Sequence, residues 1–254
     1  MLGFGFSELA ARRRGGFQPL QAAPRAWYDP SDLSTLFQDA AGTIAVAGDG
    51  DPVGRIEDKS GNGFHMTQPL SARQAVFRSA GGLQWLETDG AGDSYNIASR
   101  LDFAPNPDIA VISALRPLSN LTPIQRVFHL GGGNQVGTLA CAMGDEGYSW
   151  RFNNGNARFS LPVPGADAVV TWQRQADSSY ADSLLRLNGT EVAAVQTVND
   201  TFVPTNTDES AALFSHGTQT SDAAHIRCYG LIVLGSVAPG VISNCENWLQ
   251  EKMA

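Results

Sequence analysis

Short runs in which apolar and polar residues alternate make up most of the sequence after Trp27. Gly, Asn, Asp and Pro separate these runs at intervals of about eight to twelve residues, a spacing typical of an all-β sandwich or barrel. The predicted strands occupy residues 52–58, 74–79, 83–88, 108–118, 126–130, 138–143, 148–153, 157–161, 168–174, 183–198, 211–216 and 225–234. This number of strands predicts two packed antiparallel sheets.

The clearest turn signal lies in the run LLRLNGTEVAAV at 184–195. Asn188-Gly189 separates two apolar segments there, and Asn-Gly tolerates the positive φ angles of a two-residue hairpin turn. We therefore predict a hairpin centred on Asn188 and Gly189.

The last segment follows a different pattern. After Pro239-Gly240, apolar residues recur near helical spacing. We predict one short C-terminal helix, with Ser243 or Asn244 as its N-cap.

Composition narrows the class of protein. The chain has 254 residues and a formal net charge of −8. Its length suits one main domain, and its charge excludes a general nucleic-acid binder, which needs an excess of Lys and Arg to neutralise phosphates. The three cysteines, Cys141, Cys228 and Cys245, have no paired spacing, so we expect buried thiols rather than disulfides.

The first 24 residues stand apart, since they show no strand alternation and contain Pro19 and Pro24. We predict an N-terminal arm over 1–24 and a main domain over 25–254. The basic cluster Arg12-Arg13-Arg14 follows the short apolar stretch at the start of the sequence instead of preceding it, which argues against a signal peptide. No run approaches the roughly 18 apolar residues of a membrane helix, so we expect no membrane partner.

Several motifs resemble a known family. They are AWYDPSDLSTLFQD at 26–39, PVGRIEDKSGNGFHMTQ at 52–68, GGLQWLETDGAGDSYNI at 81–97, the LLRLNGTEVAAV run, and YGLIVLGSVAPGVISNCENWLQEKMA at 229–254. Together they resemble concanavalin A-like (laminin G-like) jelly-roll domains of phage and prophage virion proteins. The segment MLGFGFSELAARRRGG also looks like the start of virion proteins of phages and alphaproteobacterial gene transfer agents.

This resemblance implies a jelly roll displayed on a virion as a head spike, fibre, tail-associated or decoration protein. It further implies a homo-oligomer that is made in the bacterial cytoplasm and binds host capsular or surface polysaccharide. Two alternatives stay open: a structural connector without glycan binding, and a glycan depolymerase.

The arm suits attachment to other virion proteins. Apolar anchors and arginines that pair with carboxylates would fit a groove on a partner. The expected anchoring residues are Phe4, Phe6, Leu9, Arg12, Arg13 and Arg14. The alternative is a tail without fixed structure.

The stretch DKSGNGFHMT at 58–67 contains Asp58, Ser60 and His65, which invites comparison with a Ser-His-Asp triad. No Gly-x-Ser-x-Gly elbow accompanies them. Turn chemistry explains the same residues better, because Asp accepts hydrogen bonds from backbone N–H groups a few residues on and Gly supplies positive φ.

A glycanase needs two carboxylates a fixed distance apart across the sugar. Glu57-Asp58 and Asp145-Glu146 are adjacent in sequence, so on a strand their side chains would point to opposite faces. We therefore expect no catalytic residues and no enzyme.

The loop Asp89-Gly-Ala-Gly-Asp93 is acidic, but calcium needs about six or more oxygens, so solvated turns are favoured and Asp89 and Asp93 are only weak calcium candidates. The histidines have no spacing for a transition metal, and we expect no cofactor.

A sugar site needs aromatic faces beside polar groups. The densest such group, which we predict as the ligand site, comprises Tyr148, Trp150, Arg151, Asn153, Asn154 and Asn156. Aromatic residues at period two also fill the cores of sandwiches, and this alternative is favoured for Tyr148 and Trp150.

Overall fold

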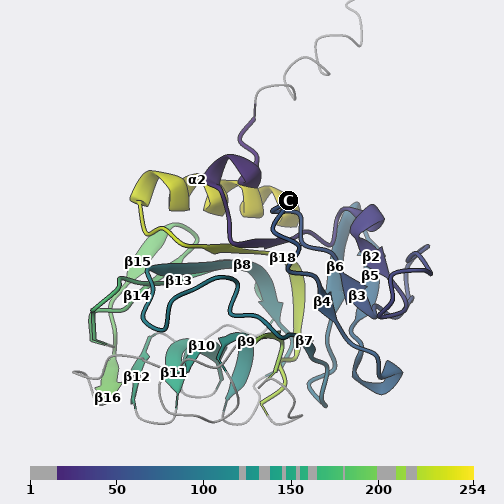
Figure 1. Cartoon of the computed structure of the whole chain (residues 1–254). Helices are drawn as coiled ribbons and strands as arrows, with labels where there is room; N and C mark the ends of the chain where they lie inside the picture. Colours follow the sequence, from purple (N-terminus) through teal and green to yellow (C-terminus); the bar gives the residue numbers. More distant parts are fainter. Residues whose placement is uncertain are drawn as a thin grey trace, which may run out of the picture.

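The strands form two antiparallel sheets that face each other, with one helix on the outside (Figure 1). The computed structural model describes residues 16–119, 124–131, 138–144, 147–152, 155–159, 165–179, 181–198, 210–215 and 222–254. Within these residues the predicted all-β sandwich with a C-terminal helix is confirmed.

The first sheet has eight strands in the described part of the chain. Their spatial order is β15 (Thr190–Val192), β14 (Leu184–Leu187), β13 (Ala168–Arg174), β8 (Ile109–Pro117), β18 (Ile226–Leu234), β6 (Leu83–Glu87) and β5 (Val76–Ala80), with β1 (Ala26–Tyr28) also paired to β18. Strand β18 is thus paired along both edges.

The second sheet has ten strands among the described residues. Their spatial order is β16 (Gln196–Val198), β12 (Gly155–Arg158), β11 (Ser149–Phe152), β10 (Leu139–Met143), β9 (Gln125–Leu130), β17 (Ala211–Leu213), β7 (Tyr95–Ile97), β4 (Met66–Thr67), β3 (Arg55–Ile56) and β2 (Leu36–Phe37). Figure 1 shows β9 to β12 stacked below β8 and β13.

The predicted hairpin is confirmed between β14 and β15. Asn188 and Gly189 have φ angles of 49° and 81°, and Leu187 pairs with Thr190 across the turn. Both positive φ angles are those that a two-residue hairpin turn requires.

Strand β8 is buried on both faces, which explains why its residues are mostly apolar instead of alternating with polar ones. Ile109, Val111 and Leu115 belong to the core between the sheets. Ala110, Ile112 and Ala114 belong to a second core on the outer face. A sheet with two apolar faces needs a cover on its outer side.

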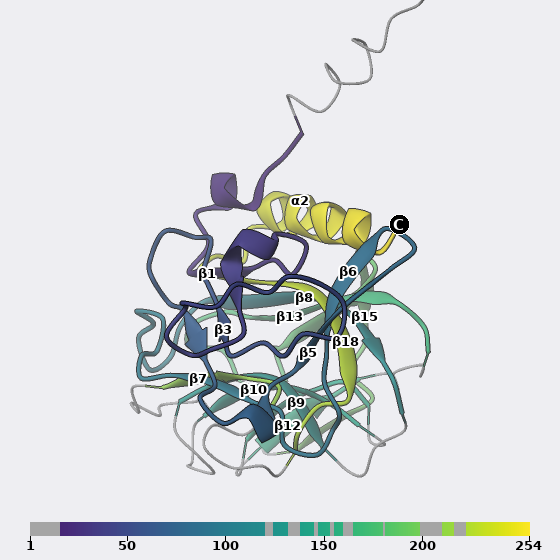
Figure 2. The same ribbon diagram turned by 90° about the vertical axis from the view of Figure 1, so that its right-hand side faces the viewer.

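Helix α2 (Pro239–Gln250) provides that cover (Figures 1 and 2). Trp248 and Leu249 pack with Trp27 and Ile232 of the sheet. The approach is close at Gly230, where a Cβ atom would lie 2.8 Å from Cδ2 of Leu249. The predicted caps were wrong, because the helix begins at Pro239, whose fixed φ suits a first turn.

Short 3-10 helices complete the described structure: η1 (Pro19–Ala22), η2 (Leu33–Thr35), η3 (Ser71–Arg73) and η4 (Glu251–Met253). Phe17 and Ala22 pack against the helix core, and η1 lies beside α2 in Figure 2. The boundary of the arm at residue 24 stays a prediction. The six expected anchoring residues between Phe4 and Arg14 lie outside the described residues.

Two further expectations concern cysteines and membranes. Cys141, Cys228 and Cys245 are free and buried, as predicted. Among the described residues, no helix combines the length and apolar character needed to cross a bilayer.

A buried ion pair ties α2 to the sheet. Nε of Arg186 on β14 lies 2.8 Å from Oε1 of Glu246, and Nη2 lies 3.0 Å from Oε2. The Thr171 hydroxyl on β13 donates to Oε1 of Glu246 at 2.7 Å. Glu246 is 1% exposed, so the helix carries a carboxylate whose only neutralising contact in the described residues is Arg186.

Replacing this carboxylate should loosen the helix. Glu246→Gln keeps the size of the side chain but leaves Arg186 without its charge partner, which should lower the free energy of unfolding by about 1–3 kcal/mol. Urea unfolding measures the loss. Glu251→Gln, at an exposed position just after the helix, is the control and should change stability by less than about 0.5 kcal/mol. Equal effects of the two substitutions would contradict the role of the pair.

Candidate functional site

The aromatic members of the predicted ligand site are enclosed in the core. Trp150 is 0% exposed and Tyr148 is 2% exposed. The Trp150 indole donates to the carbonyl of Gln173 at 3.2 Å, and the Tyr148 ring meets Trp172 edge to face at 6.0 Å. Core packing, the favoured alternative from the sequence, is what the structure shows for these two rings.

Arg151 lies on the other face of the same strand. It is half-buried, and it pairs in register with Ala140 on one side and Asn156 on the other. Burial of Arg126 on β9 lowers the pKa of its guanidinium below the ordinary value, and the nearby positive charge of Arg151 lowers it further. Asn153, Asn154 and the side chain of Asn156 lie outside the described residues, so the ligand role of the polar members stays a prediction.

The stretch DKSGNGFHMT forms the predicted turn. The buried Asp58 carboxylate accepts hydrogen bonds from the backbone N–H groups of Trp27, Ser60 and Phe64 at 2.8–3.1 Å. The Ser60 hydroxyl donates to Asp58, whereas His65 accepts from the Asp58 backbone N–H at 3.1 Å. Serine and histidine are therefore not joined as a catalytic triad would require.

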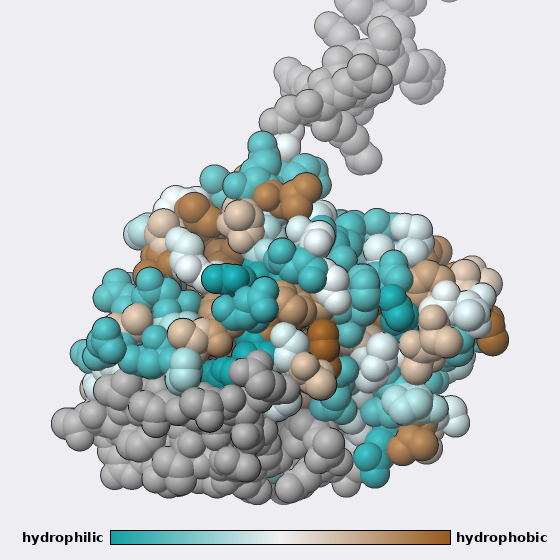
Figure 3. Space-filling view, in the orientation of Figure 1, coloured by the Kyte–Doolittle hydropathy of each residue, from teal (hydrophilic) through white to brown (hydrophobic). Residues whose placement is uncertain are grey.

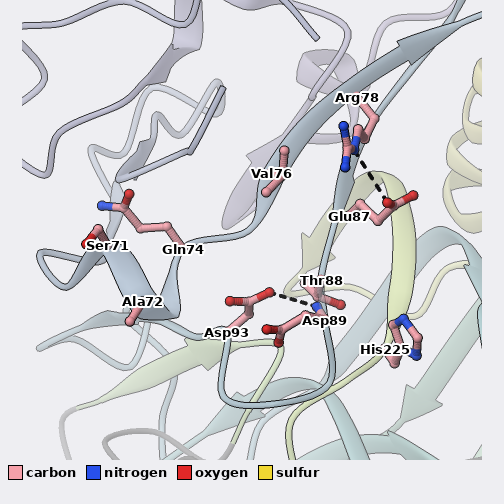
Figure 4. Close-up of a pocket in the computed structure, with 10 residues that line it drawn as sticks. All are labelled: Ser71, Ala72, Gln74, Val76, Arg78, Glu87, Thr88, Asp89, Asp93 and His225. Carbon is pink, nitrogen blue, oxygen red and sulfur yellow. Dashed lines mark hydrogen bonds and ion pairs between the residues drawn. The ribbon is translucent and has the colours of Figure 1, made fainter. Parts of the chain in front are cut away.

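Polar side chains converge instead on a cavity of about 350 Å³ beside β5 and β6 (Figure 4). Its lining comes from three separate stretches of the chain: η3 and β5, the end of β6 with the loop that follows, and the residue before β18. The lining residues are Ser71, Ala72, Gln74, Val76, Arg78, Glu87, Thr88, Asp89, Asp93 and His225.

Hydrogen bonds to the segment before β18 hold the loop after β6 in place. The Thr88 hydroxyl donates to the carbonyl of Ala224 at 2.6 Å and accepts from the backbone N–H of Ile226 at 3.0 Å. His225 is fixed in turn by Ser119, whose hydroxyl lies 3.0 Å from Nδ1. The loop after β6 is therefore attached by hydrogen bonds to the residues where β18 begins.

The charge of Glu87 is balanced by two arginines. Its Oε1 lies 3.4 Å from Nε of Arg78, and its Oε2 lies 3.2 Å from Nε of Arg227. The Trp85 indole also donates to Oε2 at 3.1 Å. Glu87 is thus held in one orientation at the edge of the cavity.

Asp89 and Asp93 lie close together at the centre of the lining (Figure 4). The backbone N–H of Asp89 donates to Oδ2 of Asp93 at 2.8 Å, and Oδ1 of Asp89 accepts from Ala91 at 2.7 Å. Asp93 is 4% exposed. Burial raises the pKa of Asp93 to about 6. The backbone hydrogen bond from Asp89 offsets part of this rise, while the charge of Asp89 and a hydrogen bond between the two side chains add to it.

The two aspartates are the weak calcium candidates from the sequence. In the described residues, no group of three or more His, Cys, Asp or Glu side chains could hold a metal ion. The calcium hypothesis therefore has two carboxylates in support and stays a prediction. Sequence reasoning noted this loop but missed Arg78, Glu87 and His225, because the local sequence does not show that β18 pairs beside the hairpin of β5 and β6.

The two facing antiparallel sheets place the chain in the class of β-sandwich proteins. No family model matches the sequence, and no curated protein resembles it significantly in sequence. Solved structures share the fold. Trypanosoma rangeli sialidase as its covalent intermediate with 2,3-difluorosialic acid has a TM-score of 0.55 at 8% identity, over 90% of this chain and 33% of the sialidase.

Sialidase from the same organism in another crystal structure has a TM-score of 0.53 at 10% identity, over 88% of this chain and 37% of the other. The chain thus spans about a third of the sialidases that it matches, and identities this low show a shared fold alone. The CBM40 domain of the Ruminococcus gnavus IT-sialidase, bound to α2,3-sialyllactose, has a TM-score of 0.48 at 14% identity over 64% of this chain and 96% of that domain. A likeness of that degree does not bear on what this chain binds.

One expectation is corrected here. The sequence led us to expect no enzyme, but solved structures that share this fold include sialidases, which are enzymes. We had required two carboxylates on one face of a strand. That criterion was too narrow, because catalytic acids can also come together in other arrangements. Asp89 and Asp93, four residues apart in a loop, show how carboxylates come together by another route.

The raised pKa of Asp93 predicts a pH-dependent stability. Because the folded-state pKa of about 6 lies above the value of about 3.9 for an unfolded Asp, this group favours folding most below about pH 4 and loses that contribution as the pH rises through 6. Asp93→Asn removes the ionisation and can still accept from Asp89. Its free energy of unfolding at pH 7.5 should exceed that of the wild type by about 1–3 kcal/mol.

Urea unfolding at pH 4.5, 6 and 7.5 measures this effect. The two proteins should be closest in stability at pH 4.5 and should diverge toward pH 7.5. Curves that stay parallel over this range would show that Asp93 does not titrate as described.

Proposed function

We propose that this chain is a glycan-binding jelly-roll domain of a virion structural protein, located in a head spike, fibre or tail-associated position, and that it binds host-surface polysaccharide. The observation that carries the glycan part is the polar cavity beside β5 and β6. The virion context rests on the resemblance of the sequence motifs.

The chemistry of the cavity supports a sugar ligand. A sugar presents several hydroxyl groups, and each can donate and accept hydrogen bonds. The carboxylates of Asp89 and Asp93 accept from hydroxyls, while Val76 offers an apolar contact to a ring face. The volume of about 350 Å³ falls within the roughly 300–1,000 Å³ of small-molecule sites.

The described surface exposes few large hydrophobic residues. In the view of Figure 3, hydrophobic residues are interspersed with polar ones. The exposed large hydrophobic residues in the described chain, Leu20, Ile44, Leu70 and Val195, lie on separate segments. Polar recognition, which suits carbohydrate, therefore fits this surface.

A second function, cleavage of the bound glycan, is favoured by one observation. Asp93 keeps a proton closer to neutral pH than an ordinary carboxyl group, because burial raises its pKa to about 6, and general acids of glycosidases share this property. The sialidases that share the fold are consistent with glycan chemistry on a chain that includes it.

Binding to an array of bacterial capsular and envelope polysaccharides tests the glycan proposal. The wild-type chain should be retained on a subset of polysaccharides, and Asp89→Ala should weaken that retention at least about tenfold, the equivalent of one charged hydrogen bond. Asp102→Ala, which removes an exposed carboxylate elsewhere, is the control. If no polysaccharide retains the wild type, glycan binding is excluded.

Release of new reducing ends, lost in Asp93→Asn, would establish the cleavage reaction.

A deletion of residues 1–15 tests the virion proposal. Residues 16–24 are kept because Phe17 and Ala22 pack on the helix core. The shortened chain should unfold at the same urea concentration as the full chain but should be missing from purified particles of a phage or gene transfer agent that carries it. Normal incorporation would contradict anchoring through this segment.

A further inference from the structure

A second cavity, of about 510 Å³, lies at the other end of β18 from the cavity beside β5 and β6. The first cavity includes His225, just before this strand, and the second includes Gly235 and Ser236, just after it. The nine residues of β18, at about 3.3 Å each, place the two cavities roughly 30 Å apart. The residues that line the second cavity are Leu20, Ala22, Ala23, Pro24, Arg25, Ser60, Asn62, Gly235 and Ser236.

Arg25 gives the second cavity a positive charge that no described residue neutralises. Its guanidinium lies over the ring of Phe103, 5.5 Å from the centroid. Its Nε stands 3.1 Å from the place that a Cβ atom would take at Gly235, so the glycine leaves room for the arginine side chain. No described carboxylate lies within ion-pair distance of this guanidinium. Packing therefore holds in place a planar fork of five N–H donors that have no acceptor in the described chain.

The lack of a partner is informative because the chain is acidic, with 25 Asp and Glu residues against 17 Lys and Arg. Most other arginines in the described chain meet a carboxylate or another partner. Ion pairs with carboxylates are formed by Arg55, Arg78, Arg116, Arg126, Arg186 and Arg227. Arg73 also forms no ion pair among the described residues, but it lines neither of the two cavities.

The groups beside Arg25 match a sugar that carries negative charge. The Ser236 hydroxyl accepts from the backbone N–H of Ala238 at 3.3 Å and keeps its own proton to donate. The Asn62 amide nitrogen donates to two backbone carbonyls at 3.0 Å, which fixes the side chain and leaves its oxygen as an acceptor for a hydroxyl. Leu20, which is 56% exposed, offers an apolar contact at the rim.

The acidic side chain of the neighbouring turn, Asp58, does not line the second cavity. Its oxygens accept from the backbone N–H groups of Trp27, Ser60 and Phe64 at 2.8–3.1 Å and from the Ser60 hydroxyl at 2.6 Å. Asp58 is also buried. Its charge is therefore committed to the turn, which leaves Arg25 as the charged group that faces a ligand in this cavity.

We propose that the second cavity binds an oxyanion, a carboxylate or a phosphate group, through Arg25 and Ser236. Resting on the proposed glycan-binding function, we further propose that the oxyanion belongs to an acidic sugar of the polysaccharide. A guanidinium donates two parallel hydrogen bonds to either group, and the Ser236 hydroxyl supplies a third. A neutral sugar would leave the charge of Arg25 unmet, and a cationic sugar would be repelled by it.

Calorimetric titration of the full chain tests the site, at pH 7.5 and low salt in a buffer without phosphate or carboxylate. Glucuronic acid or glucose 6-phosphate should bind at least about tenfold more tightly than glucose, and the tighter of the two identifies the group. Arg25→Gln should reduce that affinity at least about tenfold. Arg73→Gln makes the same change in net charge and should leave the affinity unchanged.

Two further variants separate a binding role from a structural one. Arg25→Lys keeps the charge but loses the planar fork, so its affinity should lie between those of the wild type and Arg25→Gln. Ser236→Ala leaves Arg25 and its packing on Phe103 in place and should lower the affinity about threefold. Urea unfolding of each variant shows that the chain tested is folded.

The outcomes also separate this inference from the proposed function. Retention on neutral polysaccharides alone, unchanged in Arg25→Gln, would overturn the oxyanion site while supporting glycan binding. Inorganic phosphate that binds as tightly as glucose 6-phosphate and is weakened in Arg25→Gln, with no polysaccharide retained, would support the oxyanion site and count against the glycan function. Equal affinities for glucose and both anionic sugars, or no loss in Arg25→Gln, would overturn the inference outright.

Discussion

The eight-stranded sheet is apolar on both faces, and the structure depends on covering it twice. The second sheet covers one face, and α2 with the segment around Phe17 covers the other. This constraint explains why β8 and β18 are largely apolar and why a glycine stands at position 230, where the helix approaches closely. The covering helix also buries Glu246, which pairs with Arg186. It also sets the position of the cavity, because Thr88 attaches the loop with Asp89 and Asp93 to the chain that enters β18.

Most of the fold could be predicted because strands that are five or more residues long repeat their pattern several times. The predicted range 168–174 coincides with β13, and 108–118 contains β8. The two-residue strands β2 and β4 could not be found in this way, since two residues cannot display an alternation. The start of α2 was missed because a proline at its first turn replaced the expected side-chain cap.

The candidate site was less accessible to sequence reasoning. Periodicity shows which residues of a strand share a face, but not which face is inside, so a platform role for Trp150 stayed open beside the favoured core role until its burial was known. The loop of Asp89 and Asp93 was recognised by its composition. Its partners in the cavity were not, because Arg78, Glu87 and His225 meet only through the pairing of β5, β6 and β18. The pairing of β5 with β6 is a local hairpin, but the pairing of β6 with β18 joins distant parts of the chain and leaves no mark in a local window of sequence.

The central position of β18 also bears on how the protein is made. Strands β6 and β8 leave the ribosome well over a hundred residues before the strand that joins them. Until then each presents unpaired backbone groups along one edge, which is a template for association with other chains. A premature stop or a proteolytic cut ahead of residue 226 would therefore not leave a smaller working domain. Translation through β18 is the step that commits the nascent chain to its native pairing.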